Sequence, residues 1–306
     1  MKSRVLFLIL KSRIGLFCLA LLTTCSLWRT SFDDGVSYSE PSLSFFGRTQ
    51  RTNVQVLETD IVHTQREIIV LASHKLVFFP IPKVGCSVWK KLFRRMMGYK
   101  DWKTFPPHDD QTNGLLYLAD LNTTYATQLL NDPTWTKAVM VRDPKERLLS
   151  AYLDKAWSPD NRQWIEEMCG TDLPWDISFP YFVEMVIRKR CNDPHWLPQS
   201  QSMEAKFWEV INFVGHMETA ADDAKRLLQR IGAWDDFGVK GWGGPTDRIF
   251  ESKSLVPHAT SKSAADSWER LATYFTPEME VEVEEFYSGD YSLQQFALPI
   301  RKIDFD

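Results

Sequence analysis

The stretch HKLVFFPIPKVGCSVWKKLFRRMMG, residues 74–98, decides how the chain folds. Lys75–Ile81 is a short apolar run, which is typical of a buried strand. After a turn over Pro82–Cys86, apolar residues recur from Ser87 onward at helical spacing, and Gly98 is placed to end the helix. The stretch therefore predicts a strand, a tight turn and a helix.

The turn in this stretch has the features of an anion-binding site. Backbone N–H groups and the N-terminus of a helix point to one place there, and both favour a negative charge. Gly85 allows close approach of the backbone, Ser87 adds a hydroxyl donor, and Lys83 adds a positive charge. The nucleotide-hydrolase motif G-x-x-x-x-G-K-[ST] does not occur in the sequence. We expect a phosphate-like group at this turn; the alternative is an ordinary strand-to-helix turn with a solvated lysine.

A second informative stretch, KAVMVRDPKERLLSAYLDK, covers residues 137–155. Ala138–Val141 predicts another buried strand, which a turn and a helix follow. Arg142 lies at the end of this strand, where open α/β sheets bind ligands, and Ser150 lies about two helical turns later. An arginine fork and a serine hydroxyl suit a second phosphate. The alternative is that Arg142 only pairs with Asp143.

Other segments have the periodicity of regular secondary structure. We expect helices over Leu115–Leu130 and Phe179–Arg190, and a third strand over Val210–Val214 with an amphipathic helix after it.

Together, the first two stretches resemble a known family. PKVGCSVWK is similar to the 5′-phosphosulfate-binding loop, and VRDPKERLLSAY to the 3′-phosphate-binding segment, of sulfotransferases that use 3′-phosphoadenosine 5′-phosphosulfate. Their order and spacing resemble the Golgi carbohydrate sulfotransferases that include the chondroitin 4-O- and HNK-1 types, over roughly Lys75–Phe296. The resemblance implies an α/β, P-loop-like sulfotransferase fold with a central parallel sheet flanked by helices. It also implies that the donor contacts Lys83, Val84, Gly85, Cys86, Ser87, Arg142 and Ser150.

The resemblance also implies catalytic roles. Sulfuryl transfer needs a positive charge at the transferring group, and Lys83 is expected to supply it. A general base must take the proton of the acceptor hydroxyl. His195 is the first candidate, because the family is thought to place the acceptor sugar at the corresponding segment, and His108 is the second. An acidic residue between Asp109 and Asp120 remains open as the base.

The acceptor is expected near Trp196. This tryptophan is expected to stack on a sugar face, and the basic residues Arg188–Arg190 to hold an anionic glycan. The alternative is a packed tryptophan corner beside a solvated helix end. By similarity, Pro257–Lys262 is expected to fold over the nucleotide, with a helix-capping loop as the alternative.

The N-terminal segment has the pattern of a membrane anchor. Basic residues precede the uncharged stretch Ile14–Trp28, which together with the apolar Val5–Leu10 is long enough to cross a thin membrane. A cleaved signal peptide is the alternative. We expect residues 1–29 to be a cytosolic tail and signal-anchor helix, 30–66 a luminal stem, and 67–306 the luminal sulfotransferase domain of a single-pass type II Golgi membrane protein.

The cysteines and a sequon agree with a luminal location. Cys169 and Cys191 are expected to pair in an oxidising lumen, which leaves Cys86 unpaired in the turn; the alternative is three buried thiols. Asn122 begins the glycosylation sequon Asn-Thr-Thr.

Composition limits the remaining possibilities. The chain has 306 residues, of which 44% are apolar and 25% charged, as in a globular protein. A net charge of -4 argues against a dedicated nucleic-acid binder, and no sequence cluster has metal-ligand spacing, so we expect no metal.

The sequence predicts an enzyme that moves a sulfuryl group from 3′-phosphoadenosine 5′-phosphosulfate to a glycan hydroxyl. The alternatives are a membrane-anchored lectin-like protein and a nucleotide-dependent kinase-like enzyme. The sequence indicates neither the acceptor sugar nor the oligomeric state.

Overall fold

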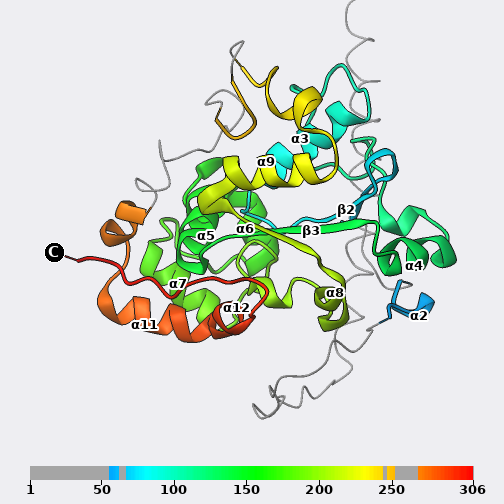
Figure 1. Ribbon diagram of the computed structural model, residues 1–306. Coiled ribbons are helices and arrows are strands. Elements are labelled where there is room, and N and C mark those ends of the chain that lie inside the picture. Colours follow the sequence, from blue (N-terminus) through cyan, green and yellow to red (C-terminus); the bar gives the residue numbers. More distant parts are fainter. Residues whose placement is uncertain (1–54, 62–66, 244–246, 252–267, 306) are drawn as a thin grey trace, which may run out of the picture. The chain divides into compact units, whose positions relative to one another are not determined.

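Figure 1 shows a computed structural model of the chain, which describes residues 55–61, 67–243, 247–251 and 268–305. The expected anchor over Ile14–Trp28, most of the expected stem and the segment Pro257–Lys262 lie outside the described residues. Among the helices that the structure describes, none is both long and apolar enough to cross a membrane.

The centre of the described structure is a sheet of four strands. They are β1 (Ile69–Leu71), β2 (Leu76–Phe79), β3 (Thr136–Val141) and β4 (Phe213–His216), and they lie side by side in this order. β1 is antiparallel to β2, whereas β2, β3 and β4 are parallel to one another. Every residue of β1, β2 and β3 is buried, as in sheets that helices cover on both faces. The expected α/β class with a central parallel sheet is therefore confirmed.

Helices surround the sheet. The α-helices are α2 (Glu58–Ile61), α3 (Cys86–Met96), α4 (Thr123–Asn131), α5 (Pro144–Ala151), α6 (Arg162–Cys169), α7 (Phe179–Ile187), α8 (Ala205–Val210), α9 (Ala220–Arg230), α11 (Pro277–Phe286) and α12 (Ser288–Ser292). The 3-10 helices are η1 (Ala72–His74), η2 (Leu118–Asp120), η4 (Pro159–Asn161), η5 (Gln199–Gln201), η6 (Met217–Thr219) and η8 (Arg270–Thr273). The π-helices are η3 (Tyr152–Ala156) and η7 (Trp234–Gly238). In Figure 1, α3 and α9 lie above the strands and α8 and α12 below them.

Two hydrophobic clusters hold these elements together. In the first, the sheet packs against α3, where the Phe78 ring lies 5.3 Å from Trp89 and 5.0 Å from Phe93. Aromatic pairs of this kind contribute about 0.5–1.5 kcal/mol each beyond the area they bury. The second cluster joins α5, α7 and α11, with Tyr152 and Phe182 in ring contact at 5.6 Å. Arg142 follows the carboxyl end of β3, and this end of the strand therefore lies between the two clusters.

The predicted strand, turn and helix of residues 74–98 are confirmed. α3 begins at Cys86, one residue earlier than expected, and Gly98 follows its end with φ +88°. Tyr99 N donates to Arg94 O at 3.1 Å, which closes the last turn around that glycine. The second stretch is confirmed as well: β3 leads into α5, where Pro144 takes the first helical position and the Asp143 side chain accepts the N–H of Lys145 and Glu146.

Three predicted elements were partly wrong. The helix expected over Phe179–Arg190 ends at Ile187, and Lys189 has a positive φ of 52°. The helix expected over Leu115–Leu130 begins only at Thr123, because its first residues pair with the edge strand instead. Leu116 O accepts the N–H of Val70 in β1 at 2.8 Å, and Leu118 N donates to Ile68 O, directly before β1, at 2.7 Å. Asn122 then caps α4 by accepting the N–H of Tyr125. The strand expected over Val210–Val214 begins at Phe213 and runs to His216, because α8 takes Val210.

Candidate active site

A pocket of about 620 Å³ opens at the carboxyl ends of β2 and β3. Most of the residues expected from the sequence line it: Lys83, Gly85, Cys86, Ser87, His108, Arg142, Ser150 and His195. Val84 is the exception, since its side chain is buried in the core. The two stretches that the sequence singles out therefore meet in one cavity.

The loop after β2 is shaped by two residues in the left-handed region, Lys83 at φ +69° and Gly85 at φ +79°. Gly85 precedes α3, and a Cβ atom there would lie 2.9 Å from the Phe250 ring and 3.2 Å from Met217 Sδ. Both its backbone angle and its surroundings require glycine. Because α3 starts directly afterwards, the N–H groups of its first turn lie at the pocket wall, which suits an anion.

Lys83 is held by a carboxylate across the pocket. Its Nζ lies 2.9 Å from Asp154 Oδ2, and its side chain is only 11% exposed. Burial lowers the pKa of Lys83, and the neighbouring Asp154 opposes that shift. Asp154 belongs to η3, a π-helical turn of the kind that is frequent at functional sites.

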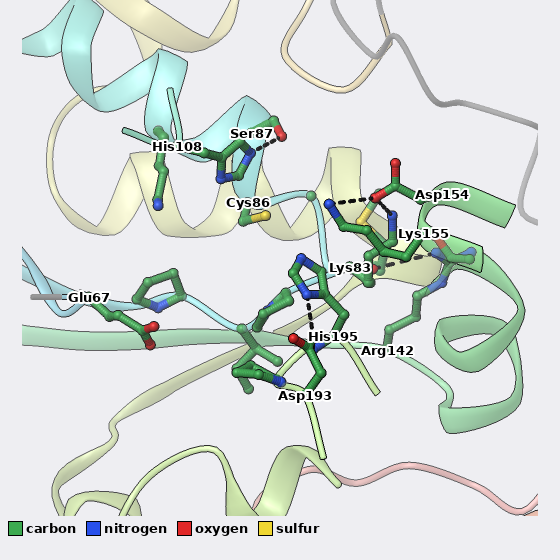
Figure 2. A pocket seen from close by; sticks show the side chains of 18 of the residues that line it. Glu67, Lys83, Cys86, Ser87, His108, Arg142, Asp154, Lys155, Asp193 and His195 are labelled. Atoms are coloured by element: carbon green, nitrogen blue, oxygen red, sulfur yellow. Dashed lines mark hydrogen bonds and ion pairs between the residues drawn. The ribbon is translucent and has the colours of Figure 1, made fainter. Parts of the chain in front are cut away.

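Arg142 is fixed by its backbone and turned toward the loop of Lys83. Its N–H donates to Gln199 Oε1 at 2.9 Å, and its carbonyl accepts Gln199 Nε2 at 2.8 Å. The guanidinium Nη1 lies 3.5 Å from Lys83 O (Figure 2). Its Nε lies 3.5 Å from Glu146 Oε2. The guanidinium of Arg142, which follows β3, thus contacts the backbone of the loop that follows β2, and both Lys83 and Arg142 line the pocket.

The two candidate bases have different surroundings. His108 Nε2 lies 2.6 Å from Ser87 Oγ, whereas His195 Nδ1 lies 2.6 Å from Asp193 Oδ1 (Figure 2). His108 lies on an exposed loop, yet its ring is partly removed from water. This desolvation, together with the positive charges of Lys90 and other nearby cations, lowers the pKa of His108 to about 4. His108 is therefore neutral at physiological pH.

The expected role of Trp196 is wrong. This side chain is 1% exposed, and its indole N–H donates to Cys191 O at 2.9 Å, so no face is open to a sugar. The alternative, a packed tryptophan corner, is what the structure has. Trp164 of α6 lines the pocket instead. Of the basic residues at the end of α7, Arg188 and Arg190 pair with Glu184, and none lines the pocket.

The expected disulfide is present. Cys169 at the end of α6 is bonded to Cys191, with Cα atoms 4.9 Å apart, so the alternative of three buried thiols is wrong. Cys86 keeps a free thiol in the pocket wall. The disulfide links α6, which carries Trp164, to the segment that leads into Asp193.

Several pocket residues were not predicted from the sequence: Glu67, Lys90, Asp154, Lys155, Trp164 and Asp193. A signal existed for Asp154, which follows Ser150 by one helical turn, and for Lys90, which follows Ser87 at the same kind of spacing. No sequence pattern pointed to Trp164, whose place in the pocket depends on how α6 packs.

The charges of the pocket suit an anionic ligand with two separate phosphate-like groups. Lys83, Lys90, Arg142 and Lys155 bring positive charge from the loop after β2, from α3, from the end of β3 and from η3. Within the part of the chain that the structure describes, no group of three or more His, Cys, Asp or Glu side chains is arranged to hold a metal ion.

Known proteins share this sequence pattern. Residues 66–297 match the family model described as "Sulfotransferase family". The chain is 31% identical over 198 residues to human carbohydrate sulfotransferase 9, which covers 58% of this chain and 43% of that protein. It is 27% identical over 184 residues to human carbohydrate sulfotransferase 14, which covers 55% of this chain and 47% of that protein. It is 31% identical over 263 residues to carbohydrate sulfotransferase 10 of Danio rerio, which covers 76% of this chain and 67% of that protein.

The extent of these matches differs between the relatives. The matched region spans somewhat less than half the length of the two human proteins and two thirds of the Danio rerio protein. No solved structure matches the chain significantly. The family model covers most of the chain and includes both loops of the pocket, and on this ground the chain belongs to the sulfotransferase family.

Proposed function

We propose that this protein is a carbohydrate sulfotransferase, which moves a sulfuryl group from 3′-phosphoadenosine 5′-phosphosulfate to a hydroxyl of a glycan. The observation that carries the proposal is the meeting of two cationic segments in one pocket, with Arg142 Nη1 3.5 Å from Lys83 O. A donor with phosphate groups at two positions of its ribose needs two such segments. Membership of the sulfotransferase family supports this donor, and the matched carbohydrate sulfotransferases support a glycan acceptor.

The donor is assigned to the residues expected from the sequence. The loop of Lys83, Val84, Gly85, Cys86 and Ser87 would hold the 5′-phosphosulfate end, with Val84 acting through its backbone because its side chain is buried. Arg142 and Ser150 would hold the 3′-phosphate.

The transfer is an in-line displacement at sulfur. The acceptor oxygen forms a new S–O bond while the S–O bond to the donor's phosphate breaks, and 3′-phosphoadenosine 5′-phosphate leaves. Lys83 stabilises the negative charge that develops on the leaving phosphate. A base takes the proton of the acceptor hydroxyl as the new bond forms.

We assign the base to His195 in preference to His108. The pKa of His108 is lowered to about 4, which makes its imidazole a weak proton acceptor, and Ser87 lies 2.6 Å from its Nε2. His195 instead has a carboxylate at its Nδ1 and lines the same pocket. His108 then serves to hold Ser87 and the donor loop in place.

The N-terminal segment is assigned to the membrane. We propose that residues 1–29 form a cytosolic tail and signal anchor, 30–66 a stem, and 67–306 the luminal catalytic domain of a type II Golgi protein. The disulfide and the exposed Asn122 of the sequon support an oxidising, glycosylating compartment. The test is protease treatment of sealed microsomes that contain the protein with a C-terminal tag. Protection of the tag would support this topology, and its digestion would contradict it.

Binding and transfer assays test the function. The full chain should be retained on immobilised 3′-phosphoadenosine 5′-phosphate and eluted by that nucleotide but not by ATP. It should also move radiolabelled sulfur from the donor to at least one member of a glycan panel. Preference for ATP would favour the kinase-like alternative, and retention on a glycan without retention on the nucleotide would favour the lectin-like one.

A further inference from the structure

Asp193 and His195 form a hydrogen-bonded pair in the pocket wall. Asp193 Oδ1 lies 2.6 Å from His195 Nδ1, and the same oxygen accepts the backbone N–H of His195 at 2.8 Å (Figure 2). Asp193 is 3% exposed, whereas the side chain of His195 is 28% exposed. An ionised carboxylate has no hydrogen to donate, so the ring proton belongs on Nδ1 and the lone pair on Nε2.

The pair also sets where Nε2 points. With Nδ1 turned to the buried carboxylate, Nε2 is the ring nitrogen left to meet a ligand in the pocket. The Trp164 ring packs nearly perpendicular to the imidazole, with ring centroids 5.6 Å apart, and limits its rotation. One side chain therefore fixes the tautomer, and together the two restrict the orientation of the ring.

The backbone that carries this pair is held from two directions. The buried Arg147 donates to Pro194 O and to Leu197 O, each at 2.7 Å. The disulfide at Cys191 anchors the same segment two residues before Asp193. A rigid support of this kind is what a proton-accepting side chain needs, because small displacements of a catalytic group cost rate.

The charges around His195 give Asp193 an electrostatic role as well. Other ionisable groups line the pocket from other segments: Glu67, Lys83, Cys86, Lys90, His108, Arg142, Asp154 and Lys155. The buried carboxylate of Asp193 is placed to stabilise the positive charge that the imidazole gains when it takes a proton. Asp193 is the acidic group in direct contact with the ring.

We propose that Asp193 is a positioning residue for sulfuryl transfer, which holds His195 in the Nδ1–H tautomer and stabilises the imidazolium formed when Nε2 takes the acceptor proton. This inference rests on the proposed function. Asp193 itself touches neither the donor nor the acceptor, so its effect appears in the chemical step and leaves donor binding unchanged.

Two substitutions of Asp193 separate the effect of its negative charge from its effect on the orientation of His195. Asp193→Asn keeps an oxygen for the backbone N–H of His195 but removes the charge, so kcat should fall. Asp193→Ala removes both, so kcat should fall by about 10- to 1,000-fold, the scale of losing an oriented general base. The Kd for 3′-phosphoadenosine 5′-phosphate should not change in either variant.

A measurement without turnover keeps the inference separate from the proposed function. In the full chain labelled with 15N at its six histidines, the signal lost in His195→Gln identifies His195. Wild type should show the Nδ1–H tautomer, and Asp193→Ala should show the Nε2–H form or a mixture. If wild type transfers no sulfuryl group, the proposed function is wrong, and the 15N signals still decide whether Asp193 sets the tautomer.

Asp132→Ala is the matched control. Asp132 accepts the backbone N–H of Thr134 at 2.7 Å in a turn of the same kind, at the end of β3 away from the pocket. It should lose some thermal stability and keep its kcat. The inference is overturned if Asp193→Ala keeps the wild-type tautomer and kcat. It is also overturned if kcat and donor affinity fall together while the tautomer stays unchanged, since that pattern indicates a structural role alone.

Discussion

Arg147 Nε donates to Pro82 O at 2.9 Å, which ties helix α5 to the residue before Lys83. The same guanidinium donates to the carbonyls of Pro194 and Leu197, so a single buried side chain joins the proposed donor loop to the turn that carries His195. Its burial lowers the pKa of Arg147, but an arginine stays charged at physiological pH. The structure therefore places a charged guanidinium, with a hydrogen bond from each of its three nitrogens, between the two halves of the site.

Replacing Arg147 should destabilise the domain and disturb both halves of the site. Arg147→Ala removes a buried side chain and leaves three partly buried carbonyls without their donor, so we expect the free energy of unfolding to fall by about 3 kcal/mol. Arg147→Lys keeps the charge but not the fork, and should recover only part of that loss. Urea denaturation of the three proteins measures the differences. Equal stability of Arg147→Lys and wild type would mean that the fork geometry is unimportant.

Lys83→Ala should remove transfer while the domain stays folded. The lysine is the proposed source of charge stabilisation at the leaving phosphate, and losing one such group costs about 100- to 1,000-fold in kcat. The rate with radiolabelled donor and circular dichroism measure the two properties. Lys91→Ala is the control, since Lys91 lies on α3 but outside the pocket, and its rate should match wild type. A Lys83→Ala enzyme that keeps the wild-type rate would exclude this lysine from the mechanism.

Arg142→Ala should weaken donor binding. Truncating one charge-assisted contact to a phosphate costs about 1.5–3 kcal/mol, so the Kd for 3′-phosphoadenosine 5′-phosphate should rise by roughly 10- to 150-fold. Isothermal titration measures this directly. Arg188→Ala on the exposed end of α7 removes an equal charge outside the pocket and should leave the Kd unchanged. An unaltered Kd in Arg142→Ala would mean that the segment after β3 does not bind the 3′-phosphate.

Local patterns were enough to predict the two segments that build the pocket. Neighbouring residues alone define the turn at Gly85. A buried apolar run precedes it, the glycine must take a positive φ, and helical spacing follows it. The meeting of Lys83 and Arg142 follows from one further fact, that β2 and β3 are parallel neighbours, so that the segments after them lie at the same edge. The residues predicted for the donor side, apart from Val84, therefore line one pocket, and their binding of the donor stays a prediction.

The other side of the pocket depends on contacts between distant residues. Trp164 and Trp196 are both aromatic residues near polar neighbours in the sequence, yet one lines the pocket and the other is 1% exposed. What separates them is how α6 and α7 pack, and a hydrogen bond to Cys191 O fixes the buried ring. Arg147 likewise bonds carbonyls 65, 50 and 47 residues away. No local pattern contains that information.

Asp143 should make the stability of the domain fall as pH rises. Burial raises the pKa of this carboxyl to about 7, against the attraction of Lys145 and with the repulsion of nearby Glu218 and Glu146. The native state then holds a proton that the unfolded chain has released between roughly pH 4 and 7, so this group's contribution is lost across that range. Asp143→Asn keeps the cap on α5 without the charge, because asparagine is also a good N-cap.

Denaturation of wild type and Asp143→Asn between pH 4 and pH 8 tests this. The variant should gain stability relative to wild type as pH rises, by on the order of 4 kcal/mol at pH 8. Other groups titrate in both proteins, so only the difference between the two curves reports on Asp143. Parallel curves would show that this carboxyl titrates in its ordinary range.

Removing the disulfide should affect stability and the acceptor side of the pocket, but not the donor side. Cys169 and Cys191 are 22 residues apart, and closing a loop of that length stabilises a fold by about 3 kcal/mol in the chain-entropy account. The bond ties α6, the helix that carries Trp164, to the segment of Asp193 and His195. Lys83 and Arg142 instead lie on loops that follow β2 and β3. The double variant Cys169→Ser, Cys191→Ser should therefore melt at a lower temperature and have a higher KM for the glycan, while its Kd for 3′-phosphoadenosine 5′-phosphate stays near that of wild type.

Cys86→Ser is the control for melting temperature, because it removes a thiol without opening a loop. A loss of nucleotide affinity equal to the loss of glycan affinity would mean that the two sides of the pocket are not independently supported.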